Sequence, residues 1–378
     1  MSERAVLHAL FEQGAVTRPE LADHTGLSKP TVSEAIRRLV AVGLVGEAGR
    51  RRGRPGRVAT YYSIERGAGF VVGVDIGGEN LRVAVADLAG ERLYERRQAT
   101  RSGGASAVTH QAAVMMADAR AAVGHAAGPL RRACVSIPGV VHSRSHRVSQ
   151  AYNIGEDDEF ELLEPLRDAL GAPITLENNV NLAALGEQQA GLGRDVPTFA
   201  FISVGAGIGM GLVYNGKLVR GANGAAGEVA HLPLTLGPAQ RRHGRAQLEA
   251  EAGGYRMLAE VRGRDWPGTR PDSVEELFAQ AAAGNPAACE LVEDEGKLIG
   301  LTVASACLVF DPALVVLGGG VGHNPMLLPI VRDTASAIAP FPPRVEISSL
   351  GERASLEGAL AVALRTARHD LLEAAGRA

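Results

Sequence analysis

Apolar side chains recur at helical spacing through the first forty residues. One pattern starts at residues 5–10, a second occupies residues 18–25, and Gly26 separates it from a third. Ser28 is the expected N-cap of the third helix because its hydroxyl can accept a free backbone amide, and Pro30 is tolerated in the first turn. The buried stripe of this helix is expected to be Val32, Ile36, Leu39 and Val40. We therefore predict three helices, with a tight turn between the last two.

Polar and basic residues remain for the outer face of the third helix, namely Lys29, Thr31, Ser33, Arg37 and Arg38. The segment resembles a helix-turn-helix, with the small Ala22 where two helices pack, Gly26 at the turn and Val32 as the anchor of the second helix. An ordinary helical hairpin with a solvated basic face is the alternative. The helix-turn-helix interpretation predicts that the outer face contacts DNA in the major groove.

Residues 43–65 have the pattern of a β-wing, with strands at 44–45 and 61–64 around an arginine-rich loop. Its basic side chains are Arg50, Arg51, Arg52, Arg54 and Arg57. The tetrapeptide from Arg52 to Pro55, RGRP, resembles an AT-hook, whose arginines fit a narrow minor groove. The wing is therefore expected to contact phosphates and the minor groove beside the helix.

The rest of the chain alternates apolar strands, glycine-rich turns and helices. The first turn lies at residues 75–80 and is followed by a strand with Leu81, Val83 and Val85; the second lies at 205–209, and an Asn215-Gly216 hairpin signal comes after it. A third strand runs into three glycines at 318–320. Because the first two share one plan, we predict two similar α/β lobes.

These turns are part of six motifs that resemble the ROK family of repressors and sugar kinases: DIGG at 75–78, SIPG at 136–139, ENNVN at 177–181, GAGIG at 205–209, GANGAAGEVAH at 221–231 and VVLGGG at 315–320. The resemblance implies an α/β fold, a winged helix-turn-helix followed by a two-lobe actin/hexokinase-like (ribonuclease H-like) body. The domains expected are a DNA-binding domain at 1–66, lobe I at 67–180, lobe II at 181–350 and a C-terminal helix at 351–378 that returns to lobe I.

The resemblance also implies roles for individual residues. The family's sugar ligands correspond here to Gly139, Asn153, Asn178, Asn179, Glu228, His231 and Glu249. Amide and carboxylate groups suit vicinal hydroxyls because they donate and accept hydrogen bonds, and Gly139 avoids a clash. The nucleotide-binding turns of the kinases correspond to Asp75, Gly77, Gly78, Gly205, Gly207, Gly318, Gly319 and Gly320.

Three positions depart from the kinases of the family. Asn179 stands where the kinases have the catalytic acid, and a carboxamide cannot act as a general base. Glu79 replaces a hydroxyl residue in the first turn, and Ala206 replaces a threonine in the second. We interpret the nucleotide-binding residues as vestigial and the body as catalytically inactive, without a cofactor.

The zinc loop of the family is also altered. Gln240, Arg242 and Gln247 occupy the positions of its cysteines, and only His231 of the four ligands remains. One imidazole does not make a structural zinc site, and His243 is expected to be an ordinary loop residue. No metal is predicted.

Composition and charge narrow the functional classes. Residues 1–66 hold 11 Lys/Arg against 7 Asp/Glu, an excess of four positive charges, although the whole chain carries −3. This basic N-terminal segment, residues 1–66, is called the head and is expected to bind a polyanion. Apolar runs are shorter than the roughly 20 residues that span a bilayer, which predicts a cytoplasmic protein without a membrane partner. Cys134, Cys289 and Cys307 are isolated and are expected to be buried.

The sequence therefore predicts a DNA-binding transcriptional regulator, most simply a repressor, that binds a paired operator as a homodimer or dimer of dimers. Its body would sense a sugar or sugar derivative. Two alternatives stay open: an active ATP-dependent sugar kinase with an accessory DNA-binding head, and a regulator that no longer binds sugar.

Overall fold

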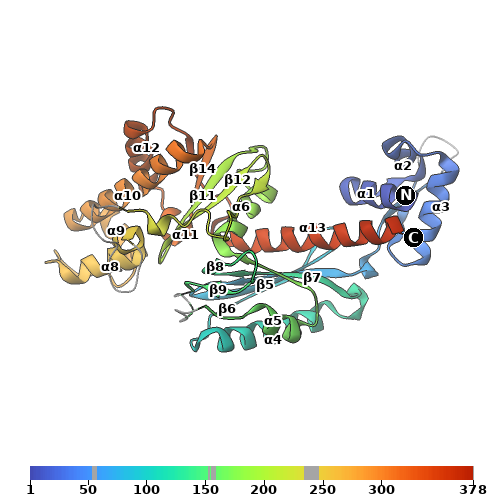
Figure 1. Ribbon diagram of the computed structural model, residues 1–378, viewed down its shortest axis with the longest axis horizontal. Helices are drawn as coiled ribbons and strands as arrows, with labels where there is room; N and C mark the ends of the chain where they lie inside the picture. The colour runs from blue at the N-terminus through green and yellow to red at the C-terminus, as the bar shows by residue number, and fades with distance from the viewer. Residues whose placement is uncertain (53–57, 152–153, 155–158, 234–246, 378) are drawn as a thin grey trace. The chain divides into compact units, whose positions relative to one another are not determined.

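The computed structural model describes residues 1–52, 58–151, 154, 159–233 and 247–377 (Figure 1). Contacts divide the chain into two compact units. Unit 1 comprises residues 1–138, 150–177 and 359–378, and unit 2 comprises residues 139–149 and 178–358. Among the described residues, no helix combines the length and the hydropathy that crossing a bilayer requires.

The head at the start of unit 1 contains the three predicted helices and a small sheet. Gly26 adopts a left-handed conformation after the second helix (φ 69°), and Ser28 caps the third helix by accepting a bond from the Thr31 amide. Both features confirm the predicted turn. The elements are α1 (Ser2–Gln13), β1 (Val16–Thr17), α2 (Arg18–Thr25), α3 (Lys29–Ala41), β2 (Val45–Arg52) and β3 (Val58–Ile64).

The core of the head confirms most of the predicted stripe of α3. Val32, Ile36 and Leu39 are at most 2% exposed, and Ala35 is fully buried with them. Val40 was expected in the same stripe, but it is 44% exposed. It follows Leu39 at about 100° around the helix, which carries it beyond the buried face near the helix end.

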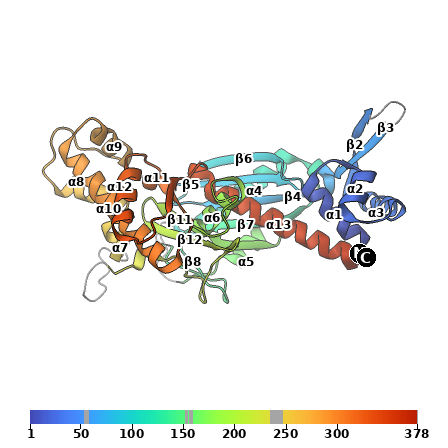
Figure 2. The same cartoon turned by 90° about the horizontal axis from the view of Figure 1, so that it is seen from above.

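The predicted wing is a hairpin of β2 and β3 that extends away from the three helices (Figure 2). Both strands are longer than the sequence pattern suggested. The short strand β1 pairs with β3 and was not predicted, giving the sheet order β1-β3-β2. Arg18 lies over the ring of Tyr62, 5.0 Å from its centroid, and this contact joins α2 to the base of the wing.

The rest of unit 1 is built on a five-stranded sheet with the order β10-β7-β4-β5-β6. Strand β4 pairs antiparallel with β5 and parallel with β7. The elements are η1 (Arg66–Ala68), β4 (Phe70–Ile76), β5 (Asn80–Asp87), β6 (Arg92–Ala99), α4 (Gly104–Val123), η2 (His125–Ala127), β7 (Leu130–Ile137), α5 (Leu163–Leu170) and β10 (Ile174–Asn178).

Unit 2 repeats this plan in the sheet β13-β12-β11-β14-β15. Strands β13, β12 and β11 pair antiparallel, whereas β14 pairs parallel with both β11 and β15. The equal strand order confirms the predicted duplication. The elements are β8 (Val140–Val141), β9 (Val148–Ser149), α6 (Asn179–Ala190), β11 (Phe199–Val204), β12 (Ile208–Tyr214), β13 (Lys217–Leu218), η4 (Val229–His231), α7 (Gln247–Glu251), α8 (Gly254–Gly263), α9 (Val274–Ala282), α10 (Pro286–Phe310), β14 (Leu314–Gly318), α11 (Gly319–Gly322), α12 (Leu327–Ile338), β15 (Arg344–Ile347) and η5 (Gly351–Arg353), and α13 (Ala354–Arg377) starts in this unit.

The sheet of unit 2 is buried on both faces, which explains its almost continuous apolar strands. Along β11, Ala200 and Ile202 face the core formed with α8, α9, α10 and α12, whereas Phe199 and Phe201 face the smaller core beside α6. Side chains of a strand alternate between its faces, so a polar residue in either set would be buried. Cys307 belongs to the larger core, but Cys289 is exposed on α10, which corrects its predicted burial.

The last turns of α13 pack against the head within unit 1. Leu371, Leu372 and Ala375 contact the apolar core of the head. Arg368 lies over the ring of Phe11 at 5.0 Å and donates to the carbonyl of Leu88. The head is therefore attached to the end of a helix whose first residues, 354–358, belong to unit 2.

Candidate DNA-binding and sugar-binding sites

The candidate DNA-binding surface is the face of α3 that the core leaves uncovered. Lys29, Arg37 and Arg38 are exposed, and Thr31 and Ser33 are partly exposed. The Ser28 hydroxyl lies 2.8 Å from that of Thr31 at the start of the helix. None of the five predicted contact residues of α3 is buried.

The wing arginines are placed only in part. Arg50, Arg51 and Arg52 belong to β2, whereas Arg54 and Arg57 lie outside the described residues. The side chains of the wing tip are likewise outside this description. Their contacts with DNA remain a prediction.

The acid of the first glycine turn is already engaged in an ion pair. Asp75 is 4% exposed, accepts a bond from the Ser136 hydroxyl at 2.9 Å, and lies 3.3 Å from Nη1 of Arg82. Arg82 was not predicted as a partner of this acid. Because Arg82 already compensates the carboxylate, Asp75 is poorly suited to attract Mg²⁺. Gly77 closes the turn by donating to the Asn80 carbonyl.

The second and third glycine turns meet in unit 2. A Cβ added at Gly205 would lie 3.8 Å from the Gly320 amide nitrogen, and one added at Gly319 (φ 80°) would collide with the Val204 carbonyl. Gly254, the first residue of α8, donates to the Gly205 carbonyl at 2.7 Å. The two glycine turns and the start of α8 thus form one compact backbone structure.

Strand β12 and the turn before it gather the segments that carry the predicted sugar ligands. A Cβ at Gly207 would meet Glu249, one at Gly209 would meet Val180 beside Asn179, and one at Gly227 would strike the carbonyl of Met210. Three segments distant in the sequence therefore lie along one strand.

Asn178 has a structural role in addition to its predicted one. Its amide donates to the Gly139 carbonyl at 2.8 Å, and its Oδ1 accepts from the backbone amides of Val180 and Asn181. It is the N-cap of α6 and brings Gly139 to the helix start. Asn179 is the first residue of that helix and is partly exposed.

Glu228 and Glu249 form the charged part of the candidate sugar site. Burial raises the pKa of the Glu228 carboxyl, and the negative charge of Glu249 raises it further. Two close carboxylates in a partly buried site favour a ligand that donates several hydroxyl groups. His231 is exposed at the end of η4, and Asn153 lies outside the described residues.

The altered zinc loop lies mostly in residues 234–246, outside the described part of the chain; this includes Gln240, Arg242 and His243. Gln247 starts α7, the helix of Glu249. Among the described residues, no group of three or more His, Cys, Asp or Glu side chains is placed to hold a metal ion.

Glu295, which was not predicted from the sequence, is connected to the second glycine turn through Gly253 and Gly254. Its Oε1 accepts a bond from the Gly253 amide at 2.7 Å, directly before Gly254 and its bond to Gly205. Within the described residues, Oε2 of Glu295 and two nitrogens of Arg256 are buried without a hydrogen-bond partner. No local signal reveals this link, since 42 residues separate Glu295 from Gly253.

Burial raises the pKa of Glu295 to about 7, although the Gly253 bond and Arg256 oppose the shift. An unfolded glutamate loses its proton near pH 4.5, so between this value and pH 7 the folded state holds more protons and stability falls as pH rises. A shift of one pKa unit corresponds to about 1.4 kcal/mol, so ionisation of Glu295 should lower the free energy of unfolding of the wild-type protein by on the order of 3 kcal/mol over this pH range. In Glu295→Gln this decrease should be absent. Denaturant unfolding at pH 5 and pH 8 measures it, with the exposed Glu275→Gln as the control. Equal pH dependence in wild type and Glu295→Gln contradicts the prediction.

Family profiles match both parts of the chain. The ROK family profile matches residues 71–366, and the MarR family profile matches residues 2–54. The xylose repressor of Caldicellulosiruptor bescii is 24% identical over 377 residues, which cover 95% of this chain and 94% of the relative.

Two solved structures share the fold. A ROK family transcriptional regulator described as a homologue of the E. coli MLC protein aligns with a TM-score of 0.77 and 21% identity, over 99% of this chain and 97% of its own. A ROK family glucokinase from Streptomyces griseus, in complex with glucose and AMPPNP, aligns with a TM-score of 0.66 and 26% identity. The kinase is covered completely but accounts for only 79% of this chain.

Proposed function

The chain belongs to the ROK family, and from this premise we propose that it is a DNA-binding transcriptional repressor whose kinase-like body binds a sugar without phosphorylating it. The observation that carries the proposal is the combination of two features in one chain. A winged helix precedes a ROK body, and Asn179 stands at the position of the catalytic acid.

The head supports the DNA-binding half of the proposal. Its third helix exposes polar and basic side chains, and arginines are concentrated in the wing. Relatives named xylose repressors align along the head as well as the body. Such a reader binds two half-sites, so we propose a homodimer or dimer of dimers acting in the cytoplasm.

The body supports the sensing half. Glu228 and Glu249 remain close together, whereas Asp75 is compensated by Arg82 and the base at position 179 is missing. A sugar can change DNA binding only if it binds the operator-binding state of the protein and the other state with different affinities. We propose that α13, which starts in unit 2 and ends on the core of the head, transmits this difference.

A selection of genomic fragments with the full-length protein, repeated with a panel of sugars, tests this function. D-xylose is the first sugar to try, because relatives carry the name xylose repressor. A fragment set that one sugar releases or strengthens is the expected result. Absence of sequence preference contradicts the DNA-binding half, and a preference that no sugar changes supports the regulator that no longer binds sugar.

Changing Arg52 and Arg54 to Ala should weaken operator binding and its dependence on salt. Each lost phosphate contact lowers the slope of log K against log salt by about 0.9, because fewer counterions are released. Titrations from 50 to 200 mM salt measure this slope. An unchanged slope would show that the wing does not contact DNA phosphates.

A further inference from the structure

An acidic residue occupies the middle of the exposed face of α3. By the helical repeat of about 100° per residue, Glu34 and Arg37 point away from the buried Val32, Ile36 and Leu39. A carboxylate here opposes the approach of DNA phosphates, yet it lies on the face predicted to enter the major groove. Its position on this face suggests a specific role.

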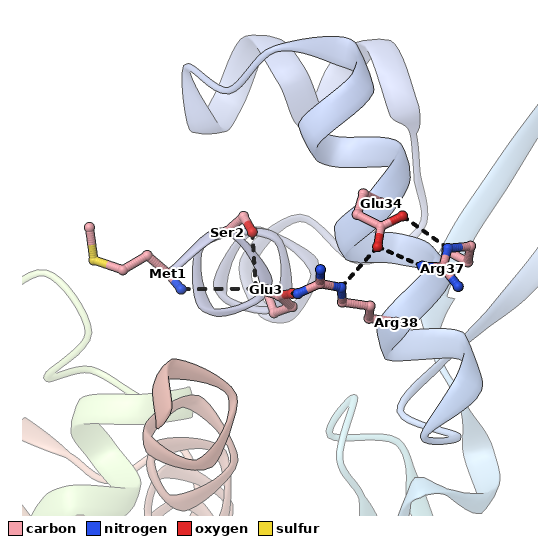
Figure 3. Close-up of polar contacts among 6 residues, drawn as sticks. All are labelled: Met1, Ser2, Glu3, Glu34, Arg37 and Arg38. Atoms are coloured by element: carbon pink, nitrogen blue, oxygen red, sulfur yellow. Dashed lines mark hydrogen bonds and ion pairs between the residues drawn. The ribbon is translucent and has the colours of Figure 1, made fainter. Parts of the chain in front are cut away.

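Figure 3 shows Glu34 between two arginines. Arg37 forms a side-on fork with it: Nε donates to Oε2 at 2.9 Å and Nη2 donates to Oε1 at 2.6 Å. Arg38 also donates to Oε1, from Nε at 2.9 Å. Both oxygens of Glu34 are thus engaged, and the arginines lower the pKa of its carboxyl to about 2. Three of the roughly four acceptor sites of this carboxylate are occupied, which leaves one lone pair on Oε2 for any base contact.

The two arginines differ in what they can still bind. Arg38 extends to α1, where Nη1 donates to Glu3 at 2.9 Å; the Glu3 side chain is only 9% exposed (Figure 3). Arg37 is 70% exposed, and Glu34 takes only the Nε edge of its guanidinium. The terminal edge, formed by Nη1 and the second hydrogen of Nη2, presents the pair of donors that matches O6 and N7 of guanine.

We propose that Arg37 recognises a guanine in each half-site, that Glu34 is its positioning residue, and that Arg38 joins α3 to α1 instead of contacting a base. This inference rests on the proposed DNA-binding function. Glu34 restricts the rotation of a long side chain, so less ordering remains to be done when DNA binds.

The test starts from a duplex selected with the full-length wild-type protein from a randomised library. Binding to this duplex, to single-base variants of it and to a scrambled duplex of equal composition is then compared. Glu34→Gln keeps the shape of the side chain but removes its charge, and Arg37→Lys keeps a charge but loses the fork.

Both variants should lower the ratio of specific to non-specific affinity about ten-fold and weaken the preference for guanine at one position of each half-site. Glu34→Gln should bind the scrambled duplex at least as tightly as wild type, because a negative charge has been removed. The double variant should lose no more than either single one. Glu12→Gln, an equal charge change on α1, should leave the ratio unchanged.

Three results overturn the inference: equal changes of both affinities in Glu34→Gln, a guanine preference undiminished in Arg37→Lys, or the same loss of preference in Arg38→Lys alone. If the wild-type protein selects no sequence, the proposed DNA-binding function fails first and the inference fails with it. If selection succeeds and one of the three results is found, only the inference fails.

Discussion

Glu228→Gln is expected to weaken sugar binding ten- to hundred-fold while leaving operator affinity unchanged. Glu228 lies in unit 2, next to Glu249 and beside strand β12, and its charge is available to hydroxyl donors. Hydrogen bonds to a charged group contribute about 1.5–3 kcal/mol, and an amide offers one acceptor where the carboxylate offers two. The head, which binds DNA, contains none of these residues.

The loss can be measured as ligand-induced stabilisation. A sugar at 100 times its Kd stabilises the wild-type protein by about 2.7 kcal/mol, and a hundred-fold weaker variant gains only about 0.4 kcal/mol at that concentration. Glu275→Gln, an equal change on the exposed side of α9, should respond as wild type does. A full response in Glu228→Gln would exclude this carboxylate from the sugar site.

The unliganded variant should also be more stable than wild type near neutral pH. The raised pKa of Glu228 means that folding penalises its ionised form. This penalty is absent below the pKa of an unfolded glutamate and grows as pH rises towards the folded value. Gain of stability together with loss of binding distinguishes a binding residue from a residue that only supports the fold.

The head was predicted well because its signals are local. The N-cap Ser28, the left-handed Gly26 and the apolar spacing of α3 each depend on residues within a few positions. The pairing of Glu34 with Arg37 and Arg38 was not predicted, although an acid three and four residues before a base is a local signal for it. Its meaning depended on knowing which face of α3 is exposed.

The hydrogen bonds and ion pairs around the glycine turns could not be predicted because they join residues that are distant in the sequence. Arg82 and Ser136 meet Asp75 across neighbouring strands, so their pairing depends on sheet register. Glu295 on α10 accepts its bond from Gly253, which is 42 positions away in the sequence and directly precedes α8. Motifs predicted the ligand segments, but the compensation of Asp75 depends on Arg82, which lies outside the motifs. The domain boundaries and the individual sugar ligands remain predictions.

Purified wild-type protein is expected to show no sustained phosphoryl transfer from ATP to any sugar that it binds. A general base contributes about 10²–10⁴ to the rate, and Asn179 cannot supply it. Asp75 is already paired with Arg82, and Glu79 adds negative charge to the first turn, where the kinases place a hydroxyl. A coupled assay over pentoses, hexoses and amino sugars measures turnover. Glu228→Gln is its control, because a contaminating kinase would be unaffected by that change.

Asn179→Asp separates the missing base from the altered phosphate turns. If only the base were lost, this change would restore sugar-dependent turnover by about 10²-fold or more over wild type. We expect it to restore none, because the ion pair of Asp75 and the charge of Glu79 still oppose a Mg²⁺-bound triphosphate. Of the two variants, only the triple variant, which combines Asn179→Asp with Glu79→Thr and Ala206→Thr, should bind ATP measurably. Turnover by wild type that Asn179→Ala removes would instead establish an active kinase. Operator binding should persist throughout the series, since every change lies outside the head.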